Sequence, residues 1–202
     1  MKKFIHLSLM LVFIFLLCSC AQSYYSLNPT RIGYNAYNNP EDITLNYRYD
    51  ILNEAGNKKM SKKERARNIK LVAVKITNNT GKVINIGNNA AFYSNNSMVY
   101  PMDAISTKNS LKQSVPSHLL YLLLSPLTLS VNNSKSFPIG LILGPAISGG
   151  NMLVAASANN NLYKELVQYD ILYRDIQPGE TVFGLVCFRN LDYVPLTIKL
   201  IK

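Results

Sequence analysis

The sequence predicts an α+β protein that is mainly β: an antiparallel β-sandwich with a Gly-rich, apolar helical insertion. Three observations lead to this fold class. Predicted strands bracket the chain: apolar and polar residues alternate with a period of two over residues 43–51, and residues 181–188 and 196–201 are apolar runs. Asn, Gly and Pro separate these segments at short intervals, which favours antiparallel strands. Between Gln113 and Tyr163, Lys135 is the only formally charged residue.

Residues 1–19 are predicted to be a signal peptide. Lys2 and Lys3 form a short positive region, and residues 4–17 are apolar except for His6 and Ser8. As a helix this apolar run spans about 21 Å. A helix that crosses a bilayer needs roughly 20 apolar residues, so this run is too short to span one. Its length is typical of a secretory signal.

The run ends in Leu17-Cys18-Ser19-Cys20, which resembles the lipobox of bacterial lipoproteins. The resemblance implies cleavage between Ser19 and Cys20, a diacylglyceryl group on the Cys20 thiol, and stable anchoring by two or three acyl chains. The alternative is an ordinary secreted protein with a cysteine near its cleavage site. Ala21-Gln22-Ser23 contains no acidic residue, which in the enterobacterial sorting scheme implies the outer membrane, facing the periplasm.

Residues 20–41 are expected to form a lipidated, flexible tether, because they are polar and rich in Asn, Pro and Gly. Residues 42–202 are expected to form the folded domain. Its first strand is predicted over residues 43–51, where Ile43, Leu45 and Tyr47 alternate with polar residues.

A basic segment follows this strand. It has two interpretations: a solvated loop or short helix, or a surface that contacts anionic head groups, lipid A phosphates or peptidoglycan carboxylates. Its basic residues are Lys58, Lys59, Lys62, Lys63, Arg65 and Arg67.

The remaining strands are predicted from apolar runs and turn residues. Residues 69–77 and 82–86 predict one hairpin, and residues 90–100, turning at 94–97, predict another. Two more strands are predicted over residues 181–188 and 196–201, the first of them preceded by Pro178-Gly179-Glu180.

The layout of Leu71 to Thr80, followed far downstream by Ile176 to Thr181, resembles the Ig-like domains of Bacteroidetes-type lipoproteins. In those domains an early strand with an Asn-rich turn pairs with a late Pro-Gly-Glu turn and strand. The resemblance implies an Ig-like β-sandwich and no activity.

The helical insertion is expected at about residues 113–168. In one interpretation its helices extend the core of the sandwich. In the other, segment 113–163 faces lipid or another subunit, and the Gly140-x-x-x-Gly144 spacing permits close helix packing. Pro145 and Gly149-Gly150 argue against an uninterrupted spanning helix, and the first interpretation is favoured.

The inventory of reactive residues argues against an enzyme. His118 is the only histidine outside the signal peptide, with an expected capping or surface role. The acidic residues are dispersed, and Cys187 lies in an apolar strand, where a buried thiol is expected. We therefore expect no catalytic residues, no cofactor and no metal. Charged residues make up only 16% of the chain, so a nucleic-acid partner is not expected.

Three functions remain open from the sequence. The first is a non-enzymatic, membrane-anchored lipoprotein with a binding or structural role in the periplasm, in contact with an envelope protein or glycan. The second is an envelope component that enters the membrane or oligomerises through segment 113–163. An envelope hydrolase is the third and least favoured.

Overall fold

The computed structural model shows an α+β protein with antiparallel sheets and a long helix. It describes residues 20–38, 42–131 and 135–201, so the expected signal peptide, with Ser19 at its cleavage site, lies outside the described residues. The chain forms two compact units. We call residues 24–112 with 159–201 the β-unit, and residues 20–23 with 113–158 the hairpin unit.

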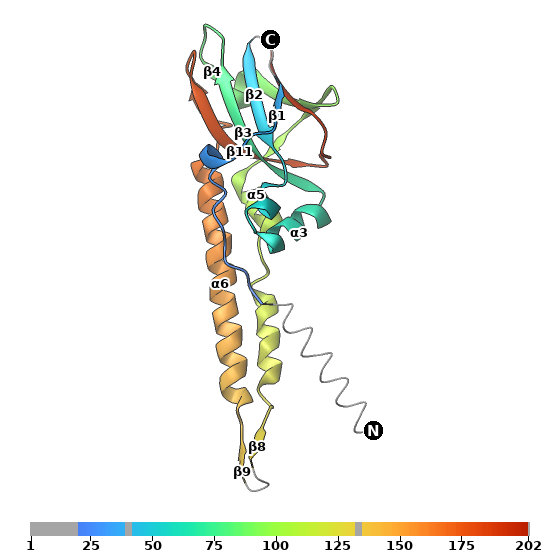
Figure 1. Cartoon of the computed structure of the whole chain (residues 1–202), viewed down its shortest axis with the longest axis vertical. Coiled ribbons are helices and arrows are strands. Elements are labelled where there is room, and N and C mark those ends of the chain that lie inside the picture. The colour runs from blue at the N-terminus through green and yellow to red at the C-terminus, as the bar shows by residue number, and fades with distance from the viewer. Residues whose placement is uncertain (1–19, 39–41, 132–134, 202) are drawn as a thin grey trace. The chain divides into compact units, whose positions relative to one another are not determined.

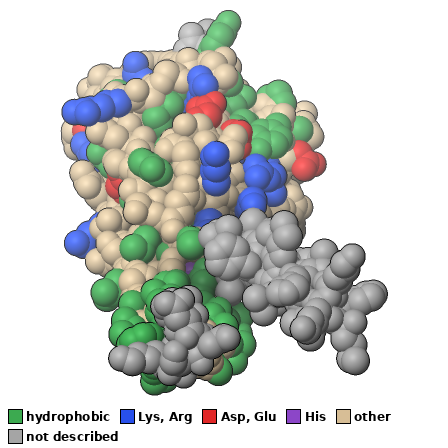
Figure 2. Space-filling model, turned by 60° about the horizontal axis from the view of Figure 1, so that its bottom comes forward, with side chains coloured by type: hydrophobic (Ala, Val, Ile, Leu, Met, Phe, Trp, Pro, Cys, Tyr) green, Lys and Arg blue, Asp and Glu red, His purple; other side chains and the backbone are tan. Residues whose placement is uncertain are grey.

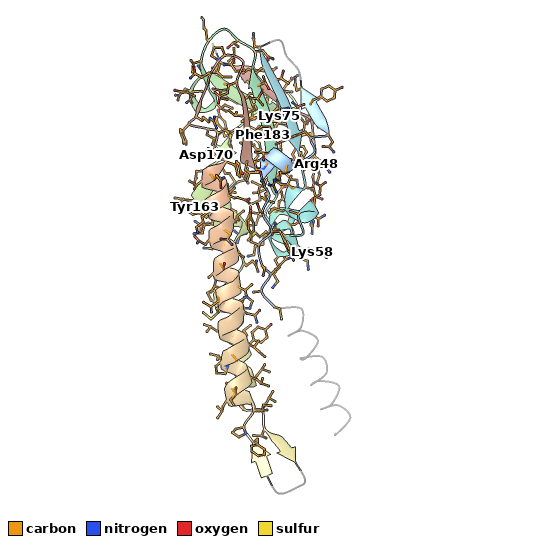
Figure 3. All side chains as sticks on the ribbon, turned by 60° about the vertical axis from the view of Figure 1, so that its left-hand side comes forward. Arg48, Lys58, Lys75, Tyr163, Asp170 and Phe183 are labelled. Atoms are coloured by element: carbon orange, nitrogen blue, oxygen red, sulfur yellow. The ribbon has the colours of Figure 1, made fainter. Side chains whose placement is uncertain are left out.

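The larger sheet of the β-unit is antiparallel and five-stranded (Figure 1). Its order is β1 (Ala36–Asn38), β2 (Ile43–Arg48), β3 (Ile69–Asn78), β11 (Thr181–Arg189) and β7 (Pro101–Met102). β3 and β11 pair along their length, from Ile69 opposite Arg189 to Thr77 opposite Thr181. Figure 3 shows Lys75 and Phe183 on these two strands, with the ammonium 5.9 Å from the ring centroid. The strands predicted over residues 69–77 and 181–188 are confirmed.

A second sheet has the order β12 (Leu196–Leu200), β5 (Ala90–Ser94) and β6 (Ser97–Val99). β5 and β6 form the predicted hairpin. Asn95 and Asn96 connect them with positive φ angles of 49° and 63°, as a two-residue turn requires for strands with the usual twist. Asparagine tolerates this left-handed conformation better than most residues, so the turn residues identified this hairpin correctly.

Two local predictions are wrong. β4 (Ile84–Asn85) pairs with β10 (Asp175–Ile176) instead of β3, because β2 and β11 already occupy both edges of β3. The Asn78 amide donates to the carbonyl oxygens of Lys82 and Ile176 and holds the chain in this path. The strand predicted over residues 43–51 ends at Arg48, because Asp50 adopts a left-handed φ of 58° and Ile51 begins a helix.

The core of the β-unit contains side chains from both sheets. Val74 of β3 and Phe188 of β11 belong to the same buried cluster as Phe92 of β5 and Ile198 of β12. The Phe92 and Phe188 rings meet edge to face at 5.3 Å, a favourable aromatic geometry. The alternation of residues along β2 places Ile43, Leu45 and Tyr47 in this core.

Short helices connect the strands of the β-unit. They are η1 (Pro29–Arg31), α2 (Ile51–Glu54), α3 (Lys58–Ala66), α4 (Ile86–Asn89) and α5 (Ala104–Leu111). The Asp103 carboxylate caps α5 by accepting from the Ser106 N–H at 2.8 Å. Hydrogen bonds from the Ser106 side chain and then from its backbone lower the pKa of Asp103.

The hairpin unit contains two apolar helical segments joined by a pair of short strands. Its elements are η2 (Pro116–Leu124), β8 (Leu129–Val131), β9 (Lys135–Phe137) and the first part of α6 (Gly140–Gln168), which continues into the β-unit. β8 and β9 pair in antiparallel register. Helical structure in the apolar middle of the chain is therefore confirmed, whereas the strand pair was not predicted.

Candidate functional site

Cys20 lies on the hairpin unit and is held there by its neighbours. The Ala21 N–H donates to the Asn151 side chain at 2.6 Å. Gln22 and Gln113 exchange two hydrogen bonds, at 2.9 and 2.6 Å. The exposed Cys20 Sγ lies 3.8 Å from the Tyr121 hydroxyl. The expected lipid-bearing thiol is thus fixed beside η2 and α6.

The next residues of the chain are held in the β-unit by a buried carboxylate. Glu165 of α6 accepts from the hydroxyls of Tyr24 and Ser26, and its Oε2 accepts from the Leu27 N–H at 2.9 Å. Burial, followed by the adjacent Glu165, raises the pKa of Tyr24, which keeps the phenol protonated as a donor. Tyr24, Ser26 and Leu27 thus bond to the β-unit, and the flexible tether over residues 20–41 stays a prediction.

The interior of the hairpin unit contains polar side chains as well as alanines. Tyr121 and His118 are buried, and their rings stack at 6.2 Å with an interplanar angle of 6°. Ser148 of α6 is also buried. The prediction of a capping or surface role for His118 is therefore wrong: one turn of η2 places it beside Tyr121, on the inner side.

Gly140 and Gly144 allow α6 to approach the η2 segment closely. A Cβ atom on Gly140 would lie 2.1 Å from the carbonyl oxygen of Leu124. A Cβ atom on Gly144 would lie 2.9 Å from the Ser125 hydroxyl and 3.1 Å from the carbonyl oxygen of Tyr121. The Gly-x-x-x-Gly spacing is thus used for packing within the hairpin unit itself.

Alanine at two glycines should have opposite effects on the hairpin unit. Gly140→Ala should disrupt its packing, because the new methyl group meets backbone atoms that cannot move aside independently. Gly149→Ala should leave it intact or stabilise it by up to about 1 kcal/mol, because nothing lies within 4 Å and alanine favours helices. Hydrogen exchange of residues 140–158 would measure both effects, and equal protection in the two variants would contradict this packing.

The outer surface of the hairpin unit is apolar. Leu123, Ile142 and Leu153 are exposed by 76%, 73% and 74%. Figure 2 shows green hydrophobic side chains gathered at the lower end of the view. The other large, exposed apolar residues of this unit are Leu119, Leu120, Leu122, Leu127, Phe137, Ile139, Leu141, Leu143 and Val154.

Among the described residues, α6 is the one helix long and apolar enough to cross a membrane by length and composition. A core helix of a soluble protein passes the same test, but only 22% of the most apolar window of α6 is buried. The window is thus mostly exposed, whereas Ala155, Ala158 and Leu162 of the same segment are buried, and the favoured core interpretation of segment 113–163 stays a prediction. Extensive exposed apolar surface is typical of sites that contact lipid or protein.

The basic segment lies on α3 and just after it. Lys58, Lys62, Arg65 and Arg67 are exposed, whereas Lys59 and Lys63 are partly buried. Figure 3 labels Lys58, where the helix begins. Lys58 and Lys59 occupy the first helical turn, which has no acidic residue, although the helix dipole disfavours positive charge there. The short-helix interpretation is confirmed, and contact with an anionic surface stays a prediction.

Two further titratable groups of the β-unit are buried. Burial raises the pKa of the Cys187 thiol to about 12, and the predicted buried thiol is confirmed. Glu64 accepts from the Leu71 N–H at 2.8 Å, and burial raises its pKa to about 7. Within the described ranges, no group of three or more His, Cys, Asp or Glu residues is placed to hold a metal ion.

No family model, no curated protein and no solved structure matches the chain. Function has to be inferred from the residues themselves.

The residues that hold the Cys20 segment could not be identified from the sequence. They are Gln113, Tyr121 and Asn151, and each lies between 91 and 130 positions from its partner.

Proposed function

We propose that the protein is a non-enzymatic, lipid-anchored lipoprotein of the bacterial cell envelope whose hairpin unit enters the bilayer. The role is a structural or binding one and needs no catalytic residue. Its location would be the outer membrane, with the β-unit in the periplasm, where an envelope protein or glycan is the partner expected from the sequence.

The distribution of polar and apolar residues in the hairpin unit supports this proposal: large apolar side chains are exposed, and some polar side chains are buried. His118 and Ser148 are buried there beside Tyr121, Ala155 and Ala158, whereas its large exposed apolar residues are mostly Leu and Ile. In water this arrangement is unfavourable, because about 25 cal/mol is lost for each Å² of apolar surface left exposed. In a bilayer the same arrangement is favourable: apolar side chains face lipid, and small residues such as Gly140 and Gly144 allow close helix packing.

The position of Cys20 supports the same proposal. An acylated Cys20 would lie at the head-group level, and Ala21 is bonded to Asn151 at that level. From Asn151 back to Gly140, α6 extends about 16 Å, and β8 and β9 add roughly 10 Å. The sum is close to the roughly 30 Å hydrocarbon core. Lys135, where β9 begins, would then lie near the opposite interface.

For the β-unit we propose the finer fold implied by the sequence resemblance, an Ig-like β-sandwich. The core cluster shared by the two sheets supports it. So does the turn contact in which the Gly179 N–H donates to the Asn78 carbonyl at 2.7 Å, since it joins the Asn-rich and Pro-Gly-Glu turns.

Vesicle flotation tests the proposed function. The chain from residue 20 with Cys20→Ala lacks the lipid, so any membrane binding must come from the protein itself. We expect it to need detergent in solution and to float with phosphatidylcholine vesicles. A dispersed monomer that does not float would overturn membrane insertion, and a stable soluble oligomer would favour the subunit-facing alternative instead.

A further inference from the structure

Two basic side chains of the β-unit bond to Asn109, in α5, and a third basic residue lies one helical turn from one of them. Arg67 donates from Nη1 to the Asn109 carbonyl oxygen at 2.9 Å. Lys112 donates from Nζ to the Asn109 side-chain oxygen at 3.1 Å. The Arg67 N–H donates to the Lys63 carbonyl oxygen at 3.0 Å, so the two residues are one helical turn apart. Burial first, and then the charges of Arg67 and Lys112, lower the pKa of Lys63. We call Lys63, Arg67 and Lys112 the basic cluster.

The basic cluster carries three positive charges. None of its three residues forms an ion pair within the described parts of the chain, where ion pairs join Arg48 to Glu54 and Arg174 to Glu180. Like charges held close together repel one another, and a bound anion relieves that repulsion. The cluster therefore has the charge and the spare donors to bind an anionic group.

Lys112 of the basic cluster directly precedes the hairpin unit in the sequence. Lys112 is followed directly by Gln113, the first residue of the second hairpin-unit segment, and consecutive Cα atoms are about 3.8 Å apart. Gln113 in turn bonds to Gln22, two residues from Cys20. If Cys20 lies at head-group level, Gln113 and Lys112 lie close to the same level.

We propose that Lys63, Arg67 and Lys112 bind the phosphate of an anionic lipid head group at the bilayer that the hairpin unit enters. The inference rests on the proposed function and names the lipid class that the protein would prefer. The Arg67 guanidinium suits two oxygens of one phosphate, and the two ammonium groups supply point charges around it. Of the three, Lys112 lies outside the basic run that the sequence singles out.

Binding to two kinds of vesicle tests the proposal. The Cys20→Ala chain should bind vesicles of phosphatidylcholine with phosphatidylglycerol more strongly than vesicles of phosphatidylcholine alone, and added salt should remove the difference. Lys63→Ala, Arg67→Ala and Lys112→Ala should each weaken binding to the anionic vesicles about fivefold, and the triple variant about a hundredfold. Binding to phosphatidylcholine alone should not change.

Lys82→Ala is the matched control, because it removes one positive charge beyond the far end of β3, whose ten residues span about 30 Å. It should bind the anionic vesicles as the parent does. A triple variant that binds them as the parent does would overturn the proposal, and so would displacement by inorganic phosphate at matched ionic strength, which indicates a free-anion site. A different outcome would overturn insertion of the hairpin unit instead. In that outcome the parent Cys20→Ala chain does not bind vesicles of phosphatidylcholine alone, but binds anionic vesicles in a way that depends on the basic cluster.

Discussion

Leu123→Asp combined with Ile142→Asp is expected to abolish vesicle flotation of the Cys20→Ala chain. Both side chains are more than 70% exposed, so aspartate should not disturb the packing of the hairpin unit in water. In a bilayer each aspartate costs about 3 kcal/mol at mid-depth, and two should weaken insertion by roughly four orders of magnitude. Flotation with phosphatidylcholine vesicles measures the loss.

A matched control distinguishes insertion of the hairpin unit from nonspecific binding through exposed apolar residues. Val83→Asp combined with Ile105→Asp changes two exposed apolar residues of the β-unit, 45% and 58% exposed. This variant should float as the parent does. The proposed insertion would be wrong if both double variants lost binding equally, or if the Leu123 and Ile142 variant still floated.

Glu165→Ala is expected to lower the free energy of unfolding by about 3–5 kcal/mol, as breaking a buried charged network does. The substitution leaves Tyr24 Oη, Ser26 Oγ and the Leu27 N–H without their shared acceptor. Residues 24–28 should then lose protection from hydrogen exchange. Urea unfolding of the Cys20→Ala chain would give the free energy.

Glu54→Ala is the control for the loss of a carboxylate. Glu54 pairs with Arg48 at 2.7 Å on the surface, and its removal should cost less than about 1 kcal/mol. If Glu165→Ala cost no more than Glu54→Ala, residues 24–28 would not be held as described.

The sequence predicts the β-unit better than the hairpin unit, for a physical reason. Strict alternation over Ile43, Leu45 and Tyr47 identifies a half-buried strand, and Asn95-Asn96 identifies the turn between β5 and β6. Pairing between distant strands is not local: nothing near Ile84 shows that its partner is Ile176.

The hairpin unit could not be interpreted from composition alone. Leu, Ile, Ala and Gly in segment 113–163 suit a protein core and a membrane equally, and only the burial of each side chain separates the two. His118 and Leu123 are five residues apart in η2, yet one is 2% exposed and the other 76%. Lys112 was missed for a related reason: it joins the basic cluster through Asn109 of α5, outside the run of bases at 58–67.

The depth of Leu123 in a bilayer tests the central claim most directly. A nitroxide label can be placed at Leu123→Cys in the Cys20→Ala chain, because the remaining thiol, Cys187, is 1% exposed with a pKa of about 12. In phosphatidylcholine vesicles we predict that the label is accessible to oxygen and protected from a polar nickel complex, with a label at Val83→Cys showing the reverse. Equal exposure of both labels to the nickel complex would contradict insertion of the hairpin unit.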